Sequence, residues 1–154
     1  MRNAARTIVI RDGYILLMKR FKIDKEYFTL PGGRIEPNET PEAAAYRETL
    51  EETSIKIANP RLVFLEDSGA PYGIQHVYLC DYVSGEPQLH PDSGEALWTV
   101  PGKNTYEPVW LPFAKLDEVP FVSVLLKEAL IDARNNGFPD SPRQFSSKHA
   151  ARLS

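Results

Sequence analysis

The amino-acid sequence predicts a layered α/β domain. Strand-like stretches open the chain, a helix follows from about residue 41, and further strand-like stretches separate it from a second helix near residue 120. This order is typical of domains in which helices cover a sheet. The chain has 154 residues, of which 42% are hydrophobic and 25% charged. That composition suffices for one hydrophobic core and excludes the disordered class.

The first elements lead to a glycine turn. The stretches RTIVI and YILLMKR flank Asp12-Gly13, the pattern of a β-hairpin. A short strand, YFTL, then precedes Pro31, Gly32 and Gly33. Because glycine has no Cβ, two adjacent glycines let the backbone approach a ligand or a metal closely.

The helix after this turn has clear start signals. Thr40 suits the N-cap, Pro41 suits the first helical position, and three alanines follow in TPEAAAYR. On a helical wheel the residues of one side form an apolar face: Ala43, Tyr46 and Leu50.

The opposite side of this helix is acidic. Glu48, Glu51 and Glu52 lie close together there, and like charges at such spacings repel by about 0.2–0.5 kcal/mol per pair. The helix dipole near the C-terminus also disfavours anions, and Arg47 offers local neutralisation. A hard divalent cation with oxygen ligands would relieve this repulsion. The alternative is a solvated face, because glutamate forms helices well and is mostly exposed.

The spacing of these residues resembles the signature of the Nudix hydrolases. Five residues separate Gly33 from Glu39, and seven more lead to Arg47-Glu48, followed by Glu51-Glu52 and Ile55. The family pattern is Gly, five residues, Glu, seven residues, Arg-Glu, an aliphatic residue, any residue, Glu-Glu, any residue, Gly and an aliphatic residue. Two positions of this sequence depart from it, Thr49 from an aliphatic residue and Ser54 from Gly.

The resemblance implies a fold, a reaction and a set of residues. It implies an α/β/α sandwich around a mixed β-sheet. It also implies hydrolysis of a nucleoside diphosphate linked to another group, with Mg²⁺ or Mn²⁺. Carried over by position, the metal ligands are the carboxylates of Glu48, Glu51 and Glu52 and the carbonyl of Gly32. In the same way Arg47 orients a glutamate, while Gly33, Glu39 and Ile55 are structural positions of the signature. The carboxylate that acts as general base stays open.

Outside the signature several residues are weaker candidates. Some relatives use a later glutamate as base or ligand, and Glu107 is the first choice here, with Glu95 behind it; a solvated loop acid is the alternative. Lys19 and Arg20, with the backbone at Gly33, could meet substrate phosphates, or the two cations could mark a solvated strand end. Four aromatic residues could stack a base, although aromatic residues near strands are more often core: Phe28, Tyr72, Tyr106 and Trp110.

The substrate stays open among several nucleotides. A short chain resembles the MutT-like members, which cleave nucleoside triphosphates. Pro71 and Tyr72 stand at distances from the signature that resemble marks of ADP-ribose hydrolases and dinucleoside polyphosphate hydrolases, respectively. A non-catalytic Nudix-fold module that senses a nucleotide is the alternative function. The retained acids favour the hydrolase, since a sensor need not keep a repulsive cluster.

The second half of the chain continues the alternation. IKI, RLVFLED, QHVYLCDYV, EALWTV and PVWLPF are strand-like, and VPFVSVLLKEALIDARNNGFP is a helix that ends near Gly137. Cys80, the single cysteine, lies in an apolar run and is expected to be an inert core thiol. We expect residues 1–139 to form one domain and residues 140–154 to form a flexible tail.

Charge and hydropathy limit the partners. A net charge of −3 and a pI near 5.6 give no electrostatic footprint for duplex nucleic acid, so the expected partner is a small-molecule nucleotide. No apolar run approaches 18 residues, and the N-terminus has no signal-peptide core, so we expect a cytoplasmic protein without a membrane partner. A homodimer stays open. We also expect Ser54, where the family has Gly at the helix end, to adopt a positive φ; the alternative is extended backbone.

Overall fold

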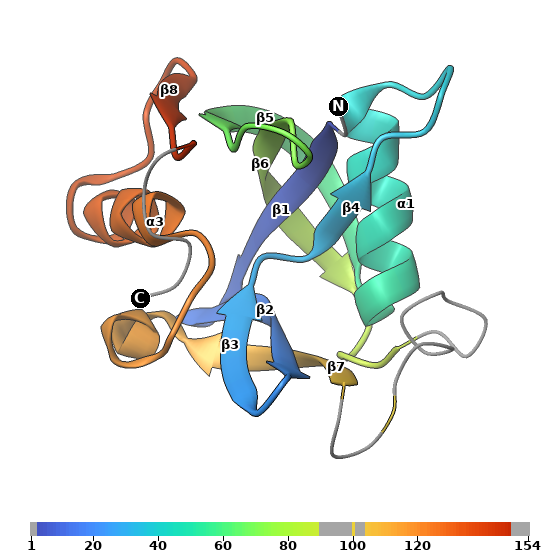
Figure 1. Ribbon diagram of the computed structural model, residues 1–154, viewed down its shortest axis with the longest axis vertical. Helices are drawn as coiled ribbons and strands as arrows, with labels where there is room; N and C mark the ends of the chain where they lie inside the picture. Colours follow the sequence, from blue (N-terminus) through green and yellow to red (C-terminus); the bar gives the residue numbers. More distant parts are fainter. Residues whose placement is uncertain (1–2, 90–99, 101–103, 149–154) are drawn as a thin grey trace.

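The computed structural model describes residues 3–89, 100 and 104–148. Strands lie between α1 on one side and η1 and α3 on the other (Figure 1), so the predicted α/β sandwich is confirmed. The strands are β1 (Ala4–Arg11), β2 (Tyr14–Lys22), β3 (Lys25–Thr29), β4 (Gly32–Arg34), β5 (Lys56–Asp67), β6 (Ile74–Ser84), β7 (Asn104–Pro112) and β8 (Arg143–Ser146). The helices are α1 (Pro41–Thr53), the 3-10 helix η1 (Phe113–Glu118) and α3 (Val124–Asn136). None of the helices in these ranges is long and apolar enough to cross a membrane.

The sheet is mixed. Its strand order is β3-β2-β1-β6-β5-β8, with β4 paired to β1 and β7 paired to β2. The pairs β1–β6 and β5–β8 are parallel and the other pairs are antiparallel. The predicted hairpin between β1 and β2 is confirmed, since Asp12 and Gly13 both take positive φ values, 52° and 82°. RLVFLED and the last two residues of IKI belong to one strand, β5, and EALWTV lies outside the described residues except for Val100.

Helix α1 packs with the face opposite to the predicted one. It starts as expected, with Thr40 Oγ1 accepting a hydrogen bond from the N–H of Ala43 at 3.1 Å. Tyr46 and Leu50 are exposed, however, so the apolar face of the wheel is not the packing face. The buried residues of α1 are Ala44, Ala45, Glu48, Thr49, Glu52 and Thr53. Four of these six are alanine or threonine, whose small side chains let the helix pack against β1 and β4, and the same face carries Glu48 and Glu52 inward.

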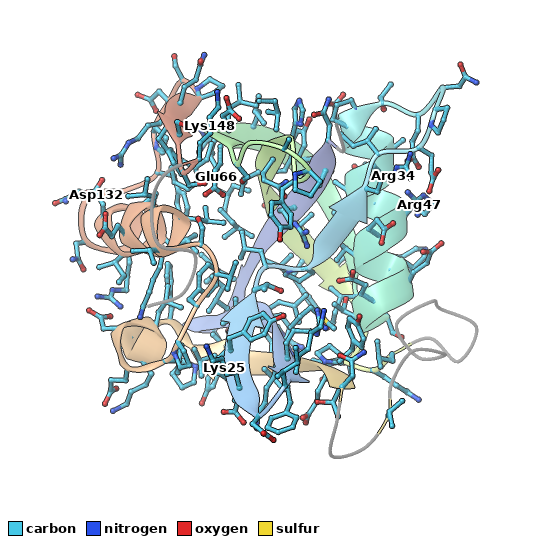
Figure 2. The ribbon with its side chains drawn as sticks, viewed as in Figure 1. Lys25, Arg34, Arg47, Glu66, Asp132 and Lys148 are labelled. Carbon is cyan, nitrogen blue, oxygen red and sulfur yellow. The ribbon has the colours of Figure 1, made fainter. Side chains whose placement is uncertain are left out.

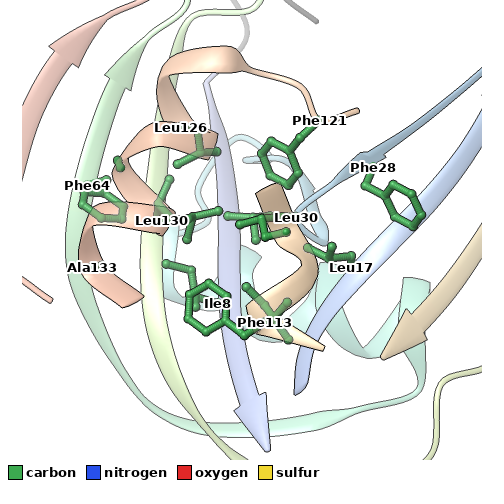
Figure 3. Packing of buried hydrophobic residues seen from close by; sticks show 14 of the residues in the cluster. Ile8, Leu17, Phe28, Leu30, Phe64, Phe113, Phe121, Leu126, Leu130 and Ala133 are labelled. Atoms are coloured by element: carbon green, nitrogen blue, oxygen red, sulfur yellow. The ribbon is translucent and has the colours of Figure 1, made fainter. Parts of the chain in front are cut away.

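The main core lies between the sheet and α3. Figure 3 shows Leu126 and Leu130 of α3 packed with Phe64, Phe121 and other buried side chains. The smaller core under α1 includes Cys80, which is buried as predicted. Burial raises the pKa of the Cys80 thiol to about 12, so the thiol stays protonated and unreactive at neutral pH.

The C-terminal residues extend the sheet, which corrects the prediction of a flexible tail after residue 139. Residues 143–146 form β8, which pairs in parallel with β5. The Phe145 ring packs on Phe64 with ring centroids 6.1 Å apart, and Ser147 is buried. The prediction of a flexible tail depended on the lack of an alternating apolar pattern after Pro139. A four-residue edge strand is held by backbone hydrogen bonds and by one apolar side chain, Phe145, so it shows no such pattern. Residues 149–154 lie outside the described residues.

Candidate active site

The glycine turn lies against α1 so closely that side chains would not fit. A Cβ on Gly32, whose φ is 143°, would lie 2.0 Å from the carbonyl oxygen of Ala5. A Cβ on Gly33 would lie 2.6 Å from the carboxylate carbon of Glu48. The first glycine therefore allows the turn to contact β1, and the second leaves room for a carboxylate of the acidic helix.

Two of the predicted metal ligands are buried at this turn. Glu48 and Glu52 are only 9% and 6% exposed, respectively, so the alternative of a solvated acidic face does not hold for them. Glu52 Oε2 accepts a hydrogen bond from the N–H of Gly32 at 3.2 Å. Residues four apart on a helix lie one above the other, so both carboxylates face the same short segment of backbone. Glu51 lies farther out, with 45% of its side chain exposed.

Arg47 holds the acidic residues together. Its guanidinium forms a fork with Glu39, with Nε to Oε2 at 2.7 Å and Nη2 to Oε1 at 2.9 Å. Its Nη1 donates to Glu48 Oε1 at 2.8 Å and lies 3.5 Å from Glu51 Oε2, and Nη2 also donates to the carbonyl of Arg34 at 3.1 Å. The hydrogen bond from Arg47 lowers the pKa of Glu39 from 4.5 to about 2, and the bond from Glu39 raises the pKa of Arg47. The ion pair is therefore present at neutral pH.

Acidic side chains outnumber the basic one in this cluster. The Arg47 guanidinium contacts three carboxylates, those of Glu39, Glu48 and Glu51, and a fourth, that of Glu52, lies at the N–H of Gly32; these five groups have a formal charge of 1 − 4 = −3. Carboxylate oxygens are the ligands that hard divalent cations prefer, so the donors fit Mg²⁺ or Mn²⁺. Their side chains are not yet arranged as a complete coordination site, because no group of three acidic, histidine or cysteine side chains in the described ranges is positioned to hold a metal.

The predicted backbone ligand already has one partner. The carbonyl of Gly32 accepts a hydrogen bond from Arg6 Nη1 at 3.1 Å. A carbonyl oxygen has two lone pairs, so this bond leaves one of them for a metal. Arg6, which reaches from β1 to the glycine turn, was not among the residues singled out from the sequence. Its position in an apolar strand, ARTIVI, was the available signal.

Lys19, Arg20 and Glu107 lie together on the β2–β7 pair, with Lys19 opposite Glu107 in register. Lys19 pairs with Glu26 at 3.6 Å, while the Arg20 guanidinium lies 3.7 Å from the ring centroid of Tyr106. Within the described part of the chain, no hydrogen bond or ion pair joins Lys19, Arg20 or Glu107 to α1. Their roles toward substrate stay predictions, and Glu95 lies outside the described residues.

The four candidate aromatic residues separate into different environments. Phe28 is a core residue, 6% exposed. Trp110 packs edge-on against Tyr82 at a centroid distance of 6.0 Å, and Tyr106 lies under Arg20. Tyr72 is half-exposed at the rim of a cavity. Tyr72 is therefore the one of these four that lines the cavity next to the glycine turn.

Both departures from the family signature have a structural reason. Thr49 Oγ1 lies 2.8 Å from Thr7 Oγ1 of β1, and both residues are fully buried, so a hydrogen bond replaces the usual aliphatic contact. Ser54 ends α1 with φ 64° and ψ 11°, so the predicted positive φ is confirmed. Its Oγ donates to the carbonyl of Gln88 at 2.6 Å, a contact that glycine could not make. Of the structural positions of the signature, Glu39 accepts a hydrogen bond from Arg47 and Gly33 lies against Glu48. Ile55 is fully buried in the smaller core under α1.

A sequence model described as the NUDIX domain matches residues 1–128. The chain belongs to the Nudix hydrolase family. Among its curated relatives, the NAD-capped RNA hydrolase NudC of Edwardsiella ictaluri is 27% identical over 122 residues, which cover 79% of this Nudix chain and 43% of that protein. NudC of Photorhabdus laumondii subsp. laumondii is 37% identical over 81 residues, covering 53% of this chain and 32% of the relative. This Nudix chain thus spans less than half the length of these curated relatives.

Solved structures show the same architecture. The MutT NUDIX hydrolase of Burkholderia pseudomallei is 28% identical, with a TM-score of 0.55 over 73% of this chain and 84% of the other. The mutator MutT protein of Bacillus halodurans has a TM-score of 0.66 over 99% of this chain and 94% of the other, at 19% identity. The second likeness supports the fold alone.

Proposed function

We propose that this Nudix domain hydrolyses a phosphoanhydride bond in a nucleoside diphosphate linked to another group, with a divalent cation bound at the acidic helix. One observation carries the proposal: two buried carboxylates, Glu48 and Glu52, face the Gly32-Gly33 turn in a cluster with a formal charge of −3. Clustered carboxylates repel one another and are costly to bury, and a bound cation would offset that cost.

The bound cation would be Mg²⁺ or Mn²⁺. When bound, such an ion neutralises the pyrophosphate and lowers the pKa of a coordinated water molecule. Glu48, Glu51 and Glu52 would hold it, with the carbonyl of Gly32 as a further ligand. Glu51 would turn from Arg47 toward the metal, which its exposed and distant pairing, 3.5 Å, permits.

The protein's own groups keep this site in shape. Arg47 fixes Glu48 by a charge-assisted hydrogen bond, while Glu39 fixes Arg47 by a fork. The N–H of Gly32 fixes Glu52. Since these bonds hold the carboxylates in place before substrate binds, little reorganisation is needed during the reaction. Glu107 stays the candidate for a further base or ligand from outside the signature.

The substrate class follows the family and the relatives. Curated relatives are named NAD-capped RNA hydrolases, and one neighbour of the same fold is an ADP-ribose pyrophosphatase from Streptococcus suis. A test panel therefore contains nucleoside triphosphates, ADP-ribose, NAD and NAD-capped RNA. We place the reaction on small-molecule nucleotides in the cytoplasm, as the sequence predicts.

The test combines turnover with a metal-binding measurement. Phosphate and nucleotide release from the panel is followed with Mg²⁺, with Mn²⁺ and with excess EDTA. We expect turnover only with a metal, and Glu52→Gln should lower it by at least a hundredfold. The control is Glu128→Gln, an exposed glutamate of α3. Binding of Mn²⁺, observed by its electron paramagnetic resonance signal, should weaken in Glu52→Gln and not in the control.

Two results would contradict the proposal. Full turnover in EDTA or in Glu52→Gln would refute the metal-dependent reaction. Nucleotide binding without hydrolysis of any panel member would favour the nucleotide-sensing module.

A further inference from the structure

A cavity of about 180 Å³ adjoins the glycine turn. Its lining includes Arg6, Tyr27, Glu66, Ser68, Tyr72 and Ser123. Arg6 connects it to the proposed catalytic site, because its Nη1 donates to the carbonyl of Gly32 at 3.1 Å. Sites for whole small molecules usually measure about 300–1,000 Å³. This cavity is smaller, so it suits one part of a ligand whose remainder lies at the glycine turn.

Glu66 is the unusual residue of this lining. It is 2% exposed, and it stands on β5 facing α3, as Figure 2 shows. Its Oε2 accepts a hydrogen bond from Ser123 Oγ, which also caps α3 by accepting from the N–H of Leu126 at 3.2 Å. Glu66 was not singled out from the sequence, because RLVFLED has the pattern of an ordinary strand end.

The second carboxylate oxygen of Glu66 is open to the cavity. Oε1 accepts no hydrogen bond from the described residues. Among the described residues, Ser147 Oγ is the one fully buried side-chain polar atom without a hydrogen-bond partner. Because Oε1 of Glu66 also lacks such a partner among these residues, Oε1 must be in contact with open space rather than fully buried. A nearly buried carboxylate with free lone pairs requires donors, because burial of an unsatisfied charged group is costly.

The cavity also offers donors of its own. Arg6 uses Nε for Gln75 at 3.2 Å and Nη1 for backbone carbonyls, and its Nη2 makes no hydrogen bond within the described ranges. Tyr27 and Tyr72 add aromatic surface, on which a planar ring can stack. A flat heterocycle with donors toward Glu66 and an acceptor toward Arg6 would satisfy both of these groups.

We propose that this cavity binds the base of the substrate and that Glu66 determines its specificity by accepting two adjacent N–H groups, the edge that guanine presents. The inference rests on the proposed function, which puts the substrate's phosphates at the glycine turn. The base then lies on the far side of Arg6 from the acidic helix.

The choice of guanine follows from the acceptor character of a carboxylate. An ionised carboxylate only accepts, and each of its oxygens has two lone pairs, so Oε2 can accept one base N–H beside its bond from Ser123 while Oε1 accepts the neighbouring N–H. The ring N–H and amino group of guanine form such a pair, with a carbonyl next to them for Arg6. In adenine and cytosine the amino group neighbours a ring acceptor, and in uracil the ring N–H lies between two carbonyls. Each of these places an acceptor against the carboxylate.

The first test is a specificity ratio. Values of kcat/KM are measured for GTP, ATP, CTP and UTP with the wild type and with Glu66→Gln. We expect the wild type to prefer GTP by about 10- to 100-fold, the range of one good bidentate pair. In Glu66→Gln, Ser123 retains the amide oxygen and the amide N–H₂ faces the guanine donors, so the preference should disappear. Glu128→Gln, an exposed control on α3, should keep it.

The second test needs neither hydrolysis nor a variant. Binding of GMP and of N1-methyl-GMP to the wild type is compared by calorimetry, since the methyl group removes one of the two donors. We expect the methylated ligand to bind at least tenfold more weakly. Equal binding of the two ligands, or an unchanged GTP preference in a folded Glu66→Gln, would overturn the inference while leaving the proposed function intact. Absence of turnover on every nucleotide would refute the proposed function, and the GMP comparison would still decide the role of the cavity.

Discussion

The fork between Arg47 and Glu39 makes a quantitative prediction about stability and pH. Glu39 has its pKa lowered from 4.5 to about 2 by the hydrogen bond from Arg47. A difference of about 2.5 pKa units corresponds to at most about 3.4 kcal/mol. Part of that energy is screened by solvent, since 30% of the Arg47 side chain is exposed. We therefore expect Glu39→Gln to lower the free energy of unfolding by about 1–2 kcal/mol at pH 7.

The effect should depend on pH in one direction. The folded pKa of Glu39 lies below the unfolded value, so the stabilisation is complete above about pH 4.5 and is lost as the pH falls toward about 2. Urea denaturation at pH 7, 4 and 2.5 should therefore show wild type and Glu39→Gln converging as the solution is acidified. The control is Glu118→Gln at an exposed pair with Lys115, which should change stability by less than about 0.5 kcal/mol. A stability difference that stays constant from pH 7 to pH 2.5 would refute the role of this ion pair.

Substitutions at three further positions test the backbone and the C-terminal strand. Ser54→Gly should change the free energy of unfolding by less than about 0.5 kcal/mol in urea denaturation, because glycine tolerates the positive φ and this offsets the lost hydrogen bond to Gln88. Ser54→Ala loses the same hydrogen bond without relieving the backbone, so it should destabilise by about 0.5–1.5 kcal/mol. Gly33→Ala should keep the fold, because only the flexible end of Glu48 must move, but should lower turnover at least tenfold; unchanged turnover would show that the position of Glu48 does not matter. Phe145→Ala should destabilise by about 1–3 kcal/mol, and an unchanged melting temperature would show that β8 is not anchored by this ring.

Local signals of the sequence predicted much of the fold. The Asp12-Gly13 turn, the Thr40 cap and the strand-helix order were each visible because they depend on neighbouring residues. The packing side of α1 was not predictable from its hydrophobicity. The helix approaches the sheet through small side chains and hydroxyls, while Tyr46 and Leu50 remain outside. A helical wheel ranks residues by hydropathy and cannot show how close a helix lies to its neighbour.

In the candidate site, too, contacts within a short segment were predictable and contacts between distant segments were not. The signature drew attention to Arg47 and the glutamates around it because they stand within one short segment, although it did not say which of them Arg47 contacts. Arg6 and Glu66 lie in apolar strands, 24 or more residues from their partners at Leu30 and Ser123. Such pairs come together only through the sheet topology, so a single sequence gives no spacing from which to infer them. The C-terminal strand was missed for the same reason, since β6, β7, η1 and α3 separate β8 from its partner β5 along the chain.

The contact between Thr7 and Thr49 constrains how this protein can change over evolutionary time. Both residues are fully buried, and each hydroxyl has the other as its neighbour at 2.8 Å. Replacement of Thr49 by the aliphatic residue usual in the family would leave the Thr7 hydroxyl without its partner, at a cost of about 1–3 kcal/mol, whereas replacement of both by valine should be nearly neutral. An apolar pair at both positions and the threonine pair of this sequence are therefore two stable alternatives separated by a less stable single mutant. A lineage can pass between them only if both positions, one on β1 and one on α1, change in close succession.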